Sequence, residues 1–171
     1  MYDAVLSYAQ LEPQDLFDLC MALARKNVRY LVDHPETARL YELARAGRVR
    51  YKDEARRVCD GDVCRVVDAK WKDIPTGLED GTIDCKSAVA WWVAECWIDG
   101  RDAVPLIRCI DCGIRSCPRC QRTKSGRTWH VQGLEGSGRV EDPSRVLGMR
   151  PHPRGDDYLV ATYDQAGIVR I

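Results

Sequence analysis

The stretch from Gly81 to Trp97 constrains the fold of this chain more than any other part of the sequence. A Gly-Thr turn leads into Asp84 and Cys85, and small and aromatic residues then recur at helical spacing until Gly100. The pattern predicts a central helix that begins at Cys85. Unpaired backbone N–H groups and the positive end of the helix dipole favour a thiolate there, so we expect a lowered pKa and a nucleophile. The alternative is a cysteine that only packs under the helix.

Two residues further along the chain fit the role of partners to a nucleophilic thiol. Residues 127–132 read as a short strand with His130, and residues 140–143 as the end of the next strand with Asp142. A glycine-rich turn at 133–138 separates the two strands. If the strands pair across this turn, His130 and Asp142 lie side by side. The order along the chain is then that of a Cys-His-Asp triad, in which imidazole takes the thiol proton and the carboxylate orients the ring.

The Gly-Thr-Ile-Asp-Cys turn before an Ala-rich helix, the Trp-His-Val strand and the Asp-Pro strand end resemble the transglutaminase-like cysteine peptidase superfamily, whose core is papain-like. The resemblance covers roughly residues 70–145. It implies that Cys85 is the nucleophile, His130 the general base and acid, and Asp142 the orienting carboxylate. Family members often carry acidic residues directly after the cysteine, whereas this chain has Lys-Ser there, which leaves the substrate preference open. Short stand-alone members are common in bacterial and phage genomes.

The segment before the nucleophile, Trp71-Lys72-Asp73-Ile74-Pro75, resembles the extended, proline-marked segment of the same family. In that position Trp71 would line the acyl site, or its indole N–H would help to stabilise an oxyanion. Packing of Trp71 in the core is the alternative.

The nine cysteines of the chain include two C-x2-C pairs between a strand expected at 103–108 and the histidine strand. Each pair has the form of a zinc knuckle, with two thiolates on one side of a tight turn, and four thiolates give a closed structural Zn²⁺ site. The four ligands would be Cys109, Cys112, Cys117 and Cys120. Because the gap between the pairs is short, an iron–sulfur cluster and free thiols remain alternatives. Cys59 and Cys64 are either two further ligands or two packed thiols.

The elements together predict one α+β domain over residues 1–171. A central helix carrying the nucleophile packs on an antiparallel sheet, as in the transglutaminase-like fold that the resemblance implies. We expect four parts: an N-terminal helical layer at 1–47, a catalytic core at 70–145, a four-cysteine zinc-knuckle insertion at 109–120 and a C-terminal hairpin at 157–171.

Charge and hydropathy exclude some classes of partner. The 26 Lys and Arg residues balance 26 Asp and Glu residues, and the basic loop lacks interleaved aromatics, so we do not expect nucleic acid as a ligand. No stretch approaches the roughly 18 apolar residues of a membrane span, and no secretory signal is visible at the N-terminus. We therefore expect a cytoplasmic protein, or a virion protein if a phage encodes it, whose cysteines are thiols or metal ligands rather than disulfides.

The predicted activity is thiol-dependent acyl transfer or hydrolysis on peptide or amide bonds through a thioester intermediate. A protein or peptide is the expected substrate, and catalysis needs no cofactor. We favour a cysteine peptidase or amidase, although the first half-reaction is the same for a transglutaminase. The alternative is a non-catalytic, zinc-stabilised structural or binding protein on the same fold, such as a phage virion component with an assembly partner.

Overall fold

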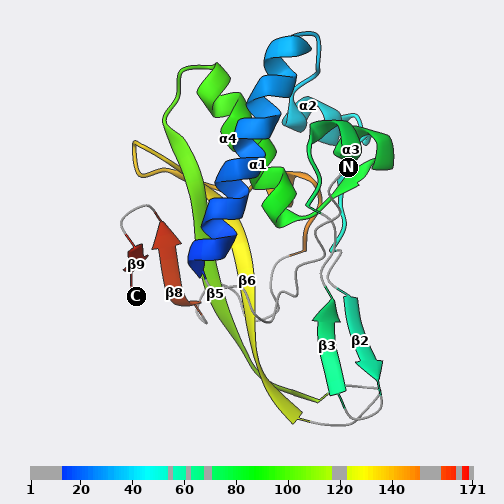
Figure 1. The fold of residues 1–171 in the computed structure, drawn as a ribbon, viewed down its shortest axis with the longest axis vertical. Helices are drawn as coiled ribbons and strands as arrows, with labels where there is room; N and C mark the ends of the chain where they lie inside the picture. Colours follow the sequence, from blue (N-terminus) through cyan, green and yellow to red (C-terminus); the bar gives the residue numbers. More distant parts are fainter. Residues whose placement is uncertain are drawn as a thin grey trace.

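The computed structural model is an α+β protein in which helices pack against an antiparallel sheet (Figure 1). The α+β class predicted from the sequence is therefore confirmed. The structure describes residues 13–53, 56–60, 63–67, 71–116, 123–150, 159–164 and 167–169, with side chains over 14–53, 71–108 and 130–150.

Five helices are found in the described part of the chain. They are α1 (Pro13–Asp33), α2 (Leu40–Arg45), α3 (Ile74–Asp80), α4 (Cys85–Ile98) and α5 (Pro143–Val146). Helices α1 and α2 form the N-terminal helical layer that the sequence predicts. None of the described helices is long and apolar enough to cross a membrane.

The largest sheet has five strands in the order β7-β6-β5-β8-β9, and each neighbouring pair is antiparallel. Its strands are β5 (Ala103–Ser116), β6 (Thr123–Glu135), β7 (Val140–Glu141), β8 (Leu159–Asp164) and β9 (Gly167–Val169). The last two strands pair with each other, within the segment where the sequence predicts a C-terminal hairpin. This hairpin extends the sheet beside β5, on the side opposite β6 and β7.

Two smaller sheets are each made of two strands. One joins β1 (Arg50–Tyr51) in parallel to β4 (Thr82–Ile83), directly before α4. The other is the hairpin of β2 (Arg56–Asp60) and β3 (Val63–Val67), in which Cys59 and Cys64 are register partners. The pairing of β1 with β4 therefore anchors the turn that leads into α4.

Helix α4 lies in the centre of the fold, as its sequence predicts (Figure 1). All its residues from Cys85 to Cys96 are buried, because α1 covers one side and the sheet covers another. A helix enclosed in this way needs no polar face. Its first turn is capped by Asp84, whose carboxylate accepts a hydrogen bond from the backbone N–H of Ser87 at 3.1 Å. The predicted start at Cys85 is confirmed.

Glu95 is the buried carboxylate of α4, and it caps a second helix. Its Oε1 accepts a hydrogen bond from the backbone N–H of Leu40, in the first turn of α2, at 2.7 Å. Burial raises the pKa of Glu95 from its ordinary 4.5 to about 7, although this hydrogen bond and the nearby Arg39 partly oppose the shift.

The raised pKa of Glu95 predicts a loss of stability between acidic and neutral pH. From pH 4.5 to 7 the unfolded chain has released the Glu95 proton while the folded protein keeps it, so the unfolding free energy falls as pH rises through this range. In the wild type we expect the unfolding free energy to fall by on the order of 3 kcal/mol over this range, and Glu95→Gln, which keeps an acceptor for Leu40, to abolish that fall. Urea unfolding at pH 4.5 and 7.5 measures the two free energies, with the exposed Glu79→Gln as control. Parallel pH curves for wild type and Glu95→Gln would contradict this assignment.

Candidate active site

Cys85 is the first residue of α4, and its side chain is 8 % exposed. The backbone N–H groups of Val131 and Lys86 lie close enough to the thiol to lower its pKa. Since Val131 belongs to β6, the thiol lies near the histidine strand, one residue beyond His130. The three cysteines with described side chains, Cys20, Cys85 and Cys96, are all free thiols.

The pKa of Cys85 is raised to about 11, because the thiol is buried. The carboxylates of Asp53 and Asp142 raise the pKa further, and the N–H groups of Val131 and Lys86 lower it. The lowered pKa expected from the helix N-terminus was therefore wrong for this arrangement, since burial outweighs the helix N–H groups. Cys85 is a neutral thiol at neutral pH and requires a base to become a nucleophile.

His130 and Asp142 are in direct contact, as the predicted hairpin implies. Strand β7 pairs with β6 through Gly133 and Leu134, and the chain then brings Asp142 back beside His130. The distance from Nε2 of His130 to Oδ2 of Asp142 is 2.8 Å. This contact occupies one ring nitrogen and leaves Nδ1 as the one that can accept a thiol proton. Among the described residues we find no hydrogen bond between the Cys85 thiol and the ring, a contact that often tightens only when substrate binds.

The surroundings of Asp142 favour the ionised form of its carboxylate. Its burial raises the pKa, but the contacts with His130, Gln132 and Arg145 together outweigh burial, so the pKa lies below its usual range. Nε2 of Gln132 also donates to Oδ2 at 3.1 Å, and Nε of Arg145 lies 3.5 Å from the same oxygen. An ionised Asp142 can therefore orient the His130 ring and stabilise an imidazolium.

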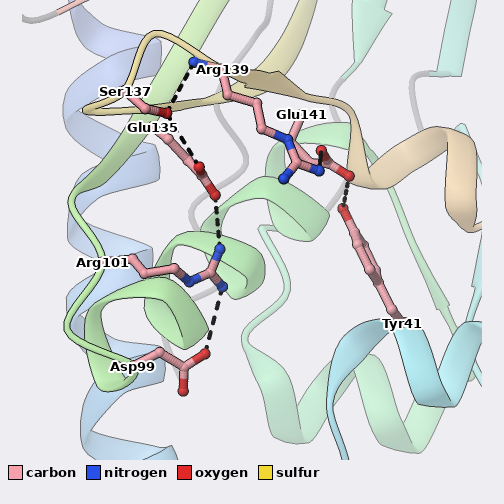
Figure 2. Close-up of polar contacts among 7 residues, drawn as sticks. All are labelled: Tyr41, Asp99, Arg101, Glu135, Ser137, Arg139 and Glu141. Carbon is pink, nitrogen blue, oxygen red and sulfur yellow. Dashed lines mark hydrogen bonds and ion pairs between the residues drawn. The ribbon is translucent and has the colours of Figure 1, made fainter.

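A polar network outside the site holds β7, the strand directly before Asp142 (Figure 2). The carboxylate of Glu141 accepts a hydrogen bond from the Tyr41 hydroxyl at 3.0 Å, and its other oxygen contacts Nη2 of Arg139 at 2.9 Å. Arg101 links Glu135, in the same hairpin, to Asp99 after α4. No sequence pattern signals these contacts, because Tyr41 and Glu141 lie 100 positions apart.

The residues around the turn at Asp84 and Cys85 are also held by contacts with their neighbours. Lys86 is buried, its ammonium group pairs with the Asp84 carboxylate, and Nζ lies 5.4 Å from the centre of the Trp71 ring. The basic residue after the cysteine therefore lies inside the protein and contributes to the shape of the turn. Nε1 of Trp71 is buried and has no hydrogen-bond partner among the described residues.

Tyr51 is a residue of the site that the sequence did not reveal. It belongs to β1, whose partner β4 leads into the turn before Cys85. Burial raises the pKa of Tyr51, and the neighbouring Cys85 and Asp142 raise it further, so the hydroxyl stays protonated beside the site. Only the pairing of β1 with β4 brings Tyr51 here, and a two-residue strand carries too little pattern to be found in advance.

The predicted zinc ligands fall largely outside the described part of the chain. Cys117 and Cys120 are not among the described residues, and only the backbone is described at Cys109 and Cys112. These two lie on β5 rather than in the tight turn expected, with a shift of register between Asp111 and Ile114. Strands β5 and β6 continue as a long ribbon beyond the helices (Figure 1), so the knuckle does not follow directly on the strand expected at 103–108. Within the described residues no group of three or more potential ligands is found.

No protein-family model matches this chain, and no curated protein or solved structure matches it significantly. A function for the protein therefore has to be inferred from the residues and geometry given above.

Proposed function

We propose that this protein is a thiol-dependent acyl-transfer enzyme of the transglutaminase-like cysteine peptidase type, acting on peptide or amide bonds. The observation that carries the proposal is the contact of His130 with Asp142 at 2.8 Å, directly before Val131, whose backbone N–H lowers the pKa of the Cys85 thiol. A histidine oriented by a buried carboxylate beside a thiol at a helix N-terminus is the arrangement that nucleophilic acyl transfer requires.

The proposed chemistry begins with a neutral thiol. As Cys85 attacks the substrate carbonyl, its proton passes to Nδ1 of His130, and Asp142 stabilises the resulting imidazolium through Nε2. The tetrahedral intermediate collapses when the imidazolium protonates the leaving amine, which departs and leaves a thioester on Cys85. His130 then deprotonates a water or an acceptor amine, whose attack releases the acyl group and restores the thiol.

The oxyanion of the tetrahedral intermediate needs hydrogen-bond donors. Backbone N–H groups at the start of α4 supply them in this proposal, and Nε1 of Trp71 is a further donor. In support of that role, Nε1 is buried and is unpaired among the described residues, and its ring lies next to Lys86 in the nucleophile turn. An unpaired buried donor of this kind costs stability in the free protein unless a ligand engages it.

A peptide-library experiment tests the proposed activity. The protein is incubated with a tryptic peptide mixture, with and without a primary amine, and products are read by mass spectrometry. Cleaved peptides support a peptidase, and amine adducts support a transglutaminase; both should disappear in Cys85→Ala. Products that persist in Cys85→Ala, or their absence from the wild type over a broad peptide mixture, would refute the proposal.

A second candidate is a non-catalytic structural or binding protein on the same fold. The observation that favours it is the burial of Cys85, whose raised pKa keeps the thiol protonated in the free protein. In this case the His130–Asp142 pair would only stabilise the hairpin. The two candidates differ in whether His130 changes the reactivity of Cys85.

We also propose that the two C-x2-C pairs bind a structural Zn²⁺, with an iron–sulfur cluster as the alternative. Protein purified without chelator is expected to contain about one equivalent of zinc by elemental analysis, and Cys117→Ser with Cys120→Ser is expected to remove it. The matched control is Cys59→Ser with Cys64→Ser, which leaves the knuckle intact. Less than about a third of an equivalent of zinc or iron in the wild type would refute a metal site.

A further inference from the structure

Arg108 lies directly opposite His130 in the sheet. The two residues are register partners on β5 and β6, so their side chains leave the same face of the sheet from neighbouring positions. Cβ atoms of such partners are about 5 Å apart. Gln132 lies two residues beyond His130 on β6 and therefore on the same face.

The Arg108 side chain is not neutralised within the described part of the chain. Its Nε is buried without a hydrogen-bond partner, and the guanidinium makes no ion pair with a described residue. Oε1 of Gln132 and Oδ1 of Asp142 are likewise buried and unpaired among the described residues. Unpaired buried polar atoms cost free energy, and here three of them lie around one histidine. The group offers one donor and two acceptors to a ligand.

We propose that Arg108 binds a carboxylate of the substrate, adjacent to the carbonyl that Cys85 attacks. This inference rests on the proposed function for the position of the substrate, although the carboxylate subsite can be measured without catalysis. Guanidinium is the side chain best suited to a carboxylate, because its planar N–H groups bind both oxygens. Gln132 Oε1 is placed to accept a hydrogen bond from an N–H of the same ligand.

Electrostatics favours the same class of substrate. The proposed reaction puts a positive charge on His130, and an unneutralised Arg108 at the neighbouring register position opposes that charge. A substrate carboxylate on Arg108 neutralises the guanidinium and removes its repulsion of the positive charge on His130. A neutral substrate would leave the two cations side by side, so we infer selectivity for acidic substrates as well as their binding.

The test measures thermal stability with small ligands at constant ionic strength. N-acetylglycine presents a terminal carboxylate, the α-amide of N-acetylaspartate presents a side-chain carboxylate, and N-acetylglycinamide is the neutral control. We expect one or both carboxylates to raise the Tm of the wild type by about 3 to 5 °C at ten times their Kd, while the neutral amide has no effect. The larger of the two shifts identifies the source of the carboxylate.

The variants assign the effect to Arg108. The carboxylate is expected to cause no rise in the Tm of Arg108→Gln and less than half of the wild-type rise in Arg108→Lys. The exposed Arg29→Gln on α1 should show the full wild-type rise in Tm. If Arg108→Gln does not fold, Arg108→Lys carries the test alone. The proposal is overturned if neither carboxylate stabilises the wild type, or if the Arg108 variants respond as the wild type does. A carboxylate effect that needs Arg108 in a protein without peptidase or transfer activity would retain the subsite and refute only the proposed function.

Discussion

The Gly133→Ala variant is expected to lose about 3 kcal/mol or more of unfolding free energy. A Cβ at Gly133 would lie 2.1 Å from Cζ3 and 2.5 Å from Cε3 of Trp92, far inside van der Waals contact. Trp92 lies on α4 and is only 4 % exposed, so its indole is enclosed in the core. The added methyl group therefore has to separate β6 from α4, and this separation also moves His130 away from Cys85.

A denaturant titration under reducing conditions measures the effect, with Gly136→Ala as the matched control in the same hairpin. There an added Cβ meets the side chain of Asp102, which is exposed and can rotate away, so we expect a loss below about 1 kcal/mol. In a Trp92→Leu background, Gly133→Ala should cost clearly less than in the wild type. Equal costs in the two backgrounds, or a Gly133→Ala protein as stable as the wild type, would show that β6 and α4 are not packed as described.

Substitutions in the proposed triad are expected to have the largest effects on the proposed activity. Cys85→Ala should abolish acyl transfer, because no nucleophile remains, and His130→Ala should lower the rate of acyl-enzyme formation about 10³-fold. Asp142→Asn should lower it at least about 10²-fold, since an amide can neither stabilise an imidazolium nor fix the ring tautomer. Single-turnover measurements on a peptide cleaved by the wild type give these rates.

Two matched controls separate catalysis from folding. Glu141→Gln changes the neighbouring carboxylate, which contacts Tyr41 and Arg139 and not the histidine ring, so its activity should stay within about threefold of the wild type. His34→Ala removes an exposed histidine that stacks on Tyr30, and it should leave the rate unchanged. If Asp142→Asn is no slower than Glu141→Gln, Asp142 does not orient the base.

The helix start at Cys85 and the contact of His130 with Asp142 were predictable because each is local in sequence. A capping aspartate and an apolar run define the start of α4, and a glycine-rich turn is enough to pair two adjacent strands. The contact between His130 and Asp142 then follows from the register, since only 12 positions separate them.

The features that were missed depend on contacts between distant segments. The pKa of Cys85 is set by burial under α1 and against β6, and the sequence does not show how deeply a helix N-terminus is covered. Arg108 lies within the strand expected at 103–108, but its place opposite His130 depends on the register of β5 against β6, which the sequence does not show. Tyr51 enters the site through a parallel pairing of two-residue strands, which leaves no periodic pattern to detect.

The measurement that tests the triad most directly is the rate of Cys85 alkylation by iodoacetamide at pH 7 in the wild type and in His130→Ala. Peptide mass spectrometry scores each of the nine cysteines separately, so that Cys20 and Cys96 serve as internal controls. A thiol with a pKa of about 11 is only about one part in 10⁴ ionised at this pH, and its reaction depends on a neighbouring base. We predict that Cys85 reacts at least about tenfold faster in the wild type than in His130→Ala, while Cys20 and Cys96 are unchanged. Equal Cys85 rates in the two proteins would contradict the catalytic account and favour the structural protein.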